Sequence, residues 1–163
     1  MKIHDVSFWK GKSVLVTGHT GFKGAWLSLL LHEFGAKVIG ISLKPATNPN
    51  LYTLLGLEDS ICSHIQDIRD STELSNIVSE ADPEIIFHLA AQPLVRQSYE
   101  EPVNTFSTNI MGTLNLLECV RDLKNLASLV CITTDKVYRN NELRIPYVES
   151  DSLGGYDPYS SSK

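Results

Sequence analysis

The sequence predicts an α/β fold built around a doubly wound parallel sheet, with helices on both faces. Two observations predict it. Short apolar runs alternate with segments of helical periodicity along the whole chain. A glycine-rich turn follows the first of these runs. At 163 residues the chain has room for one domain with a single sizeable core.

The first part of the chain predicts two strands, one long helix and one short helix. "SVLVT" (13–17) is a continuous apolar run, typical of a strand that is buried on both faces. "GAWLSLLLHEF" (24–34) has apolar residues at helical spacing, and Gly35 follows as its expected C-cap. "AKVIGIS" (36–42) is predicted as the second strand, and "NLYTLLGL" (50–57) as a short helix in a long connection.

The second part repeats the alternation. "ICSHIQ" (61–66) is a weaker third strand, and 70–80 opens with Ser, Thr and Glu in the manner of a capping box, which indicates a helix. "PEIIFHLA" (83–90) predicts the fourth strand, 104–123 a long helix, and "SLVCITT" (128–134) the fifth strand. Because each pair of strands is joined through a helix, we expect all five strands to be parallel.

Composition and charge narrow the functional class. The formal net charge of −5 disfavours binding to nucleic acid or to an anionic membrane, because no basic stripe is present to neutralise phosphates. The strongest apolar run (25–31) is too short to span a bilayer, and 1–12 lacks the apolar segment of a signal peptide, so we expect a cytoplasmic protein. Cys62, Cys119 and Cys131 are scattered and are interpreted as reduced thiols, and the histidines show no metal-ligand spacing, so no metal is predicted.

The turn after the first strand, "TGHTGFKG" (17–24), carries three glycines at intervals of three residues. Gly18 permits a tight turn, Gly21 lets the backbone approach a pyrophosphate, and Gly24 lets helix and strand pack closely. A glycine turn without a ligand is the plainer alternative. The strand before it and the helix after it favour a Rossmann-like dinucleotide site. His19, inside this loop, is expected to be exposed, and Trp26 to lie in the core.

A tyrosine and a lysine lie four residues apart in "YSSSK" (159–163) at the end of the sequence. On a helix this spacing places Tyr159 and Lys163 on one face. An ammonium beside a phenol favours the phenolate, which makes a general base usable near neutral pH. The alternative is a surface tyrosine and lysine on a polar loop.

The glycine spacing and the Tyr-x-x-x-Lys pair resemble the short-chain dehydrogenase/reductase superfamily, and the resemblance runs from about Lys12 to Lys163. The stretch 87–118 looks like the extended, nucleotide-sugar branch. "ITTDKVY" (132–138), together with 40–57, resembles the CDP-glucose 4,6-dehydratase family, with lysine where enzymes of thymidine-linked glucose have glutamate.

This resemblance implies a reaction. The sugar is oxidised at carbon 4, loses its 6-hydroxyl as water and regains the hydride at carbon 6. Tyr159 would deprotonate the 4-hydroxyl, Thr134 would hydrogen-bond it, and Lys163 would hold the nicotinamide ribose. Asp135 would act as the acid, which requires a proton that burial would help to retain and a neighbouring lysine would oppose. Lys136 would act either as a neutral base or as a cation that stabilises an enolate-like intermediate, unless it simply reaches solvent.

The resemblance also implies the residues that hold cofactor and substrate. Asp67 and Ile68 would flank the adenine, although Asp67 also suits a helix N-cap. Arg96 would bind the substrate pyrophosphate, unless it is a surface residue. The full cofactor set is Gly18, Thr20, Gly21, Phe22, Lys23, Gly24, Ser42, Lys44, Asp67, Ile68, Leu89, Ala90, Ala91, Gln92, Thr133, Tyr159 and Lys163.

The resemblance favours NAD as the cofactor, and NADP stays open. No acidic residue lies about 20 residues past the glycines to bind a ribose. Ser42 is able to hydrogen-bond a ribose there, whereas Lys44 would suit a 2′-phosphate.

The expected partners are a nucleotide-sugar substrate and a second copy of the protein, which would pair through 104–123. The family pattern places a substrate domain beyond Lys163, so we expect 1–163 to be an incomplete dinucleotide-binding domain, inactive alone.

A 4-epimerase is the nearest alternative function, but its reaction eliminates no water and so does not need the acid/base pair Asp135 and Lys136. A non-catalytic dinucleotide-binding fragment or sensor is the alternative of another class.

Overall fold

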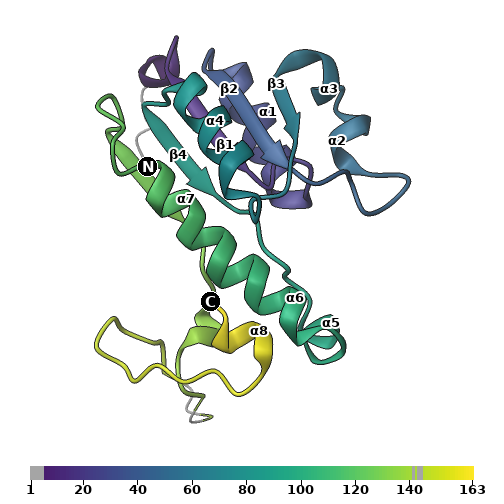
Figure 1. The fold of residues 1–163 in the computed structure, drawn as a ribbon, viewed down its shortest axis with the longest axis vertical. Helices are drawn as coiled ribbons and strands as arrows, with labels where there is room; N and C mark the ends of the chain where they lie inside the picture. Colours follow the sequence, from purple (N-terminus) through teal and green to yellow (C-terminus); the bar gives the residue numbers. More distant parts are fainter. Residues whose placement is uncertain (1–5, 141, 143–144) are drawn as a thin grey trace.

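The computed structural model describes residues 6–140, 142 and 145–163, and it confirms the predicted α/β fold. One sheet of five parallel strands has the order β3-β2-β1-β4-β5 (Figure 1). The strands are β1 Ser13–Thr17, β2 Lys37–Ser42, β3 Cys62–Ile65, β4 Ile85–His88 and β5 Ser128–Cys131. Each lies inside the range predicted for it, because runs of apolar residues mark strands that neighbours cover on both sides.

The helices follow the predicted alternation, with four short additions, η1, α3, α5 and η3, and the long helix ends at Cys119. They are η1 Val6–Trp9, α1 Phe22–Glu33, α2 Leu51–Leu54, α3 Leu57–Ser60, α4 Ser71–Ala81, α5 Val95–Glu100, α6 Pro102–Phe106, η2 Ser107–Gly112, α7 Thr113–Cys119, η3 Asp135–Val137 and α8 Pro158–Ser161. Helix α5 was not predicted. Segments α6, η2 and α7 form the long helix expected over 104–123, and its middle part, η2, is π-helical.

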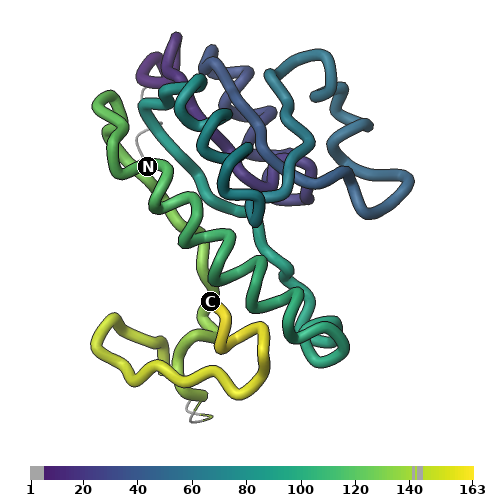
Figure 2. The backbone as a smooth tube through the Cα atoms, in the orientation of Figure 1, coloured from purple at the N-terminus to yellow at the C-terminus, as the bar shows by residue number. Residues whose placement is uncertain are grey.

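Helices cover both faces of the sheet, as Figure 2 shows for the backbone. On one face α4 and α7 pack against the sheet, and Leu74 and Leu116 join Leu15 and Ile86 in one core cluster. On the other face α1 packs through Leu31 in a second cluster. Because alternate residues of a strand point to opposite faces, the central strands contribute to both clusters.

The ends of two helices follow local rules. Gly35 has φ +82°, and the N–H of Ala36 donates to the carbonyl of Leu31 at 3.0 Å, which closes α1 as the glycine predicted. The N-cap of α4 is Asp70, whose carboxylate accepts from the N–H of Glu73 at 3.2 Å. Asp67 is therefore not the cap of this helix.

The expectation that Trp26 lies in the core is wrong. The side chains of Trp26 and Leu30 are each 49% exposed. The buried face of helix α1 includes Ala25, Ser28 and Leu31. Trp26 and Leu30 lie beside this face of the helix, and their side chains therefore point outward.

The long helix extends beyond the edge of the sheet, and α5 and α8 lie at its far end (Figure 1). The described residues of 138–157 form a projecting loop on that side, where the rings of Tyr138 and Tyr147 stack at 4.9 Å. In the described part of the chain, none of the helices combines the length and apolar character needed to cross a membrane.

Candidate functional site

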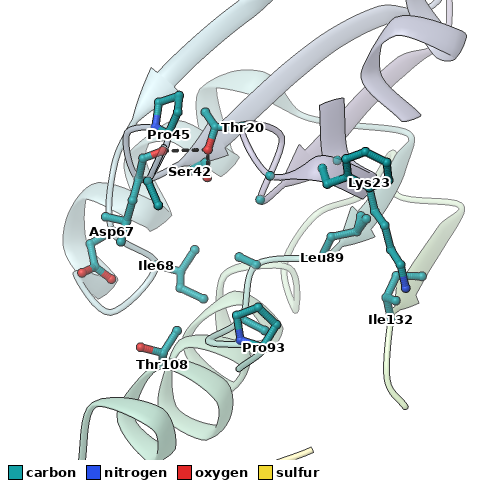
Figure 3. Close-up of a pocket in the computed structure, with 18 of the residues that line it drawn as sticks. Thr20, Lys23, Ser42, Pro45, Asp67, Ile68, Leu89, Pro93, Thr108 and Ile132 are labelled. Carbon is teal, nitrogen blue, oxygen red and sulfur yellow. Dashed lines mark hydrogen bonds between the residues drawn. The ribbon is translucent and has the colours of Figure 1, made fainter. Parts of the chain in front are cut away.

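A cavity of about 550 Å³ opens at the carboxyl ends of the strands, where open α/β sheets bind ligands (Figure 3). Segments that follow all five strands contribute to its wall. The lining residues are Gly18, Thr20, Gly21, Phe22, Lys23, Gly24, Ser42, Leu43, Lys44, Pro45, Ala46, Gln66, Asp67, Ile68, Leu89, Ala90, Ala91, Pro93, Thr108, Ile132, Thr133, Tyr159 and Lys163.

The glycine loop lies close to neighbouring backbone on both sides. Gly18 has φ +76°, and a Cβ atom there would lie 2.8 Å from the backbone nitrogen of Ala90. A Cβ at Gly24 would lie 2.1 Å from the carbonyl oxygen of Gly18. Gly21 caps α1 without a side-chain hydrogen bond, so the first N–H groups of this helix have no side-chain cap. This cradle fits a pyrophosphate, because a helix N-terminus offers N–H donors to negative charge.

His19 is buried, contrary to the expectation of an exposed loop residue. Its Nε2 lies 2.7 Å from the hydroxyl of Ser63, and its ring contacts the ring of Tyr52 edge-on at 5.3 Å between centroids. Burial lowers the pKa of His19 to about 4, so the ring is neutral near pH 7. His19 thereby joins the glycine loop to β3. The sequence signal was Gly40, a glycine inside a strand, which leaves room for the ring.

Thr20 and Ser42 form one wall of the cavity (Figure 3). The hydroxyl of Thr20 donates to the carbonyl of Leu43 at 2.8 Å, and its oxygen lies 2.8 Å from the hydroxyl of Ser42. Since Thr20 donates its only hydroxyl proton to Leu43, Ser42 donates to Thr20. The oxygen of Ser42 therefore remains able to accept a hydrogen bond from a ligand hydroxyl.

Asp67 and Ile68 line the same side of the cavity as Ser42 and Pro45, away from Lys23 (Figure 3). The carboxylate of Asp67 accepts from Nε of Arg69 at 3.0 and 2.9 Å. These hydrogen bonds hold the pKa of Asp67 below its usual range. At this end of the cavity the carboxylate is therefore ionised and forms a salt bridge with the guanidinium of Arg69.

Leu89, Ala90 and Ala91 line the cavity after β4, but Gln92 does not. Gln92 is buried, and its backbone N–H donates to the Oδ1 of Asn109 at 2.8 Å while its side-chain amide donates to Thr105 at 2.9 Å. Its polar atoms are thus hydrogen-bonded within the protein.

Tyr159 and Lys163 both line the cavity and are half-buried. Tyr159 lies on helix α8, and Lys163 follows the helical turn, with its backbone N–H donating to the carbonyl of Ser160 at 3.4 Å. Asp157 caps α8 by accepting from the N–H of Ser160 at 2.9 Å. Burial lowers the pKa of Lys163.

Thr134, Asp135 and Lys136 lie outside the set of residues that line the cavity. Thr134 caps η3, and its hydroxyl donates to Asp135 at 3.2 Å. Asp135 and Lys136 are exposed in the described chain. Although partial burial opposes it, hydrogen bonds from Ser160 and the positive charge of Lys136 lower the pKa of Asp157.

Arg96 is exposed on α5 and also lies outside the cavity lining. Sequence reasoning missed several lining residues, among them Pro93, Thr108 and Ile132. Thr108 belongs to the π-helical segment, for which the sequence offered no signal.

Comparisons with known proteins agree with this geometry. The model of the family described as GDP-mannose 4,6 dehydratase matches residues 15–163. A CDP-glucose 4,6-dehydratase of Salmonella typhimurium is 55% identical over 159 residues, which cover 98% of this chain and 44% of that protein. The chain thus spans about half the length of the curated relatives it matches.

Two solved structures show the same fold. A UDP-glucose-4-epimerase from Stenotrophomonas maltophila, with bound NAD and formylated UDP-arabinopyranose, superposes with a TM-score of 0.81 at 26% identity, over 93% of this chain and 45% of that one. A UDP-glucose 4-epimerase from Thermus thermophilus in complex with NAD gives a TM-score of 0.77 at 28% identity, over 92% of this chain and 47% of that one.

Proposed function

Because this chain belongs to the GDP-mannose 4,6-dehydratase family, we propose that the protein is a nucleotide-sugar 4,6-dehydratase that converts CDP-glucose to CDP-4-keto-6-deoxyglucose. The observation that carries the proposal is the position of Tyr159 and Lys163 in the wall of the glycine-loop cavity. A general base beside a dinucleotide site suits removal of a hydroxyl proton coupled to hydride transfer.

The cavity suits NAD as cofactor, which when bound would supply the hydride chemistry at carbons 4 and 6. Gly18, Gly21 and Gly24 would hold the pyrophosphate, and Ser42 would accept a hydrogen bond from the ribose. The carboxylate of Asp67 neutralises the guanidinium of Arg69, which would otherwise attract the extra phosphate of NADP at that end of the cavity. The NAD named in the two epimerase structures supports the same choice.

Each catalytic residue has a proposed task. Tyr159 removes the proton of the 4-hydroxyl, which Thr134 orients by a hydrogen bond. Once carbon 4 is a ketone, the proton on carbon 5 is acidic and would pass to a water molecule, while the charge left on the sugar is stabilised electrostatically. Asp135 then protonates the leaving 6-hydroxyl, which departs as water. Lys136 remains cationic and stabilises the enolate-like charge, which agrees with its exposed position near Asp157.

Arg96 is proposed to bind the substrate pyrophosphate. Helix α5, which carries it, contacts α8, which carries Tyr159. A guanidinium at that place would hold a diphosphate with two parallel hydrogen bonds.

A 4-epimerase is the second candidate, since the similar structures include epimerases. An epimerase returns the hydride to carbon 4 and eliminates no water. Asp135 and Lys136, which follow Thr134 directly, supply the acid and the cation that elimination requires. These two residues favour the dehydratase over both an epimerase and a non-catalytic dinucleotide-binding protein.

The full-length protein, of which residues 1–163 would be the dinucleotide-binding part, is further proposed to be a homodimer that pairs through the long helix formed by α6, η2 and α7. Val103, Ile110 and Met111 are 80%, 44% and 49% exposed, and they line an apolar groove of about 430 Å³ together with residues around them. An exposed apolar face of this kind favours association. Ile110→Glu is expected to give monomers in sedimentation, whereas Val148→Glu, outside the long helix, is the control that leaves association unchanged.

Isotope tracing tests the reaction. The natural protein is incubated with NAD and CDP-glucose labelled with deuterium at carbon 4, and the product is analysed by mass spectrometry and NMR. Deuterium at carbon 6 of a 4-keto-6-deoxy product is the expected result. Deuterium retained at carbon 4 of an epimer would support the epimerase instead. Parallel reactions with the TDP-, UDP- and GDP-sugars test the choice of nucleotide.

A further inference from the structure

We propose that His88, the last residue of β4, is a positioning residue that fixes Tyr159 and Lys163 through a chain of buried hydrogen bonds. This proposal rests on the proposed function of those two residues. His88 is 3% exposed and is joined by its two ring nitrogens to different parts of the molecule.

The proton positions around His88 are determined by its neighbours. Thr17 Oγ1 accepts from the backbone N–H groups of Leu89 and Ala90, both at 3.1 Å. The proton of Thr17 is therefore donated to Nδ1 of His88, at 2.7 Å. The ring proton must then be on Nε2, which donates to Oγ1 of Thr113 at 2.8 Å. His88 is thus a neutral ring with a single tautomer.

The chain continues into the π-helical segment. Because Thr113 Oγ1 accepts from His88, its own proton is donated to the carbonyl of Asn109 at 2.7 Å. Asn109 is buried, and its Nδ2 donates to the carbonyl of Gln92 at 3.1 Å and to Oγ of Ser162 at 2.7 Å. The hydrogen bonds therefore lead from the core of the sheet to the residue before Lys163.

Ser162 completes the link to the catalytic turn. Its hydroxyl donates to the carbonyl of Tyr159 at 2.7 Å while its oxygen accepts from Asn109. Ser162 is 5% exposed, so water does not compete for these bonds. These two hydrogen bonds hold the turn that carries Tyr159 and Lys163 at the cavity wall.

The charge state of His88 agrees with this role. Burial, together with the positive charge of Lys163, lowers the pKa of His88 to about 4. A second proton on the ring would occupy Nδ1 and break the bond from Thr17. The neutral ring also spares Lys163 a second cation nearby, which would disfavour its ammonium form.

Thr113 provides the sharpest test, because valine has its shape without the hydroxyl and serine keeps the hydroxyl. The chain with Thr113→Val or Thr113→Ser is labelled with acetic anhydride over a range of pH, and the titration midpoint of Lys163 is read by mass spectrometry. Lys37, exposed on β2, serves as the internal reference. No substrate or turnover is needed, so this result is separate from the test of the dehydratase reaction.

Thr113→Val is expected to raise the midpoint of Lys163 by about half a unit, because a loosened turn exposes the ammonium to water. Thr113→Ser is expected to leave it unchanged. A Lys163 midpoint that stays the same in Thr113→Val, with only the melting temperature lowered, would overturn the proposal and make the chain of hydrogen bonds merely structural.

A second pair of variants applies if Thr113→Val does not fold. In His88→Gln the amide reaches toward Thr113 as Nε2 does, whereas in His88→Asn it reaches only toward Thr17 as Nδ1 does. We expect the glutamine variant to keep the Lys163 midpoint and the asparagine variant to shift it. Equal shifts in the two variants would contradict the positioning role.

Discussion

The imidazole of His19 occupies the volume that a side chain at Gly40 would need. A Cβ atom on Gly40 would lie 2.4 Å from Cγ of His19 and 2.6 Å from its Nδ1. Gly40 is in the middle of β2, and His19 is in the glycine loop after β1, so the contact ties the loop to the sheet. The glycine loop that would hold the pyrophosphate is thus packed against strand β2 through a neutral, buried histidine.

Gly40→Ala is expected to lower the free energy of unfolding by roughly 1–3 kcal/mol, because a rigid ring fills the space of the new methyl group. Urea denaturation followed by circular dichroism measures the change. Gly154→Ala is the matched control, since its nearest neighbour would be Cβ of Arg139 at an ordinary 3.5 Å. Equal losses in the two variants would refute the packing argument.

The stability of the chain is expected to fall as the pH is lowered from about 6.5 to about 4. Burial lowers the pKa of both His19 and His88 from 6.5 to about 4, so between these values the unfolded state binds more protons than the folded state. Each histidine then contributes a loss of up to about 1.4 kcal/mol per pH unit.

Urea midpoints measured from pH 7.5 to 4.5 check this dependence. His19→Asn should reduce the change of the urea midpoint with pH. His32→Gln, at an exposed site on α1, is the control for removing a histidine. A stability that stays flat down to pH 4.5 would show that neither buried ring resists protonation.

Lys136→Met is expected to slow formation of the 4-keto-6-deoxy product about 10²-fold or more, whereas Lys136→Arg should retain most of the activity. Arginine keeps the positive charge but is not able to act as a neutral base. The measurement is product formation by the natural protein at saturating CDP-glucose. Equal losses in both variants would assign Lys136 the role of base instead of cation.

The protein is expected to bind NAD more tightly than NADP, and Asp67→Asn should reduce the difference between the two affinities. Asp67 lines the cavity and its carboxylate neutralises the guanidinium of Arg69, so Asp67→Asn would leave that positive charge free to attract an added phosphate. Lys44→Ala should weaken binding of NADP more than binding of NAD. Fluorescence titrations with the reduced cofactors give both affinities, and a preference for NADP in the unchanged protein would contradict the assignment.

The sequence by itself determined the elements that depend on local pattern. The apolar runs predicted all five strands. The glycine spacing predicted the turn whose residues Gly18, Gly21 and Gly24 line the cavity. These features are readable because a strand buried on both faces, or a backbone with φ near +76° at Gly18, restricts which residue types fit. The pair Tyr159 and Lys163 was equally readable, and both side chains line the cavity.

Only the tertiary structure decided which polar residues are buried. His19 lies among Gly40, Tyr52 and Ser63, and its partner Ser63 is 44 residues away, so the residues next to His19 in the sequence did not indicate its burial, and only the distant Gly40 was a signal. The same holds for His88, whose bonds join β1 to α7 across separations of 71 and 25 residues. A polar side chain becomes a core residue when distant partners satisfy its hydrogen bonds, and those partners are brought together only by the fold.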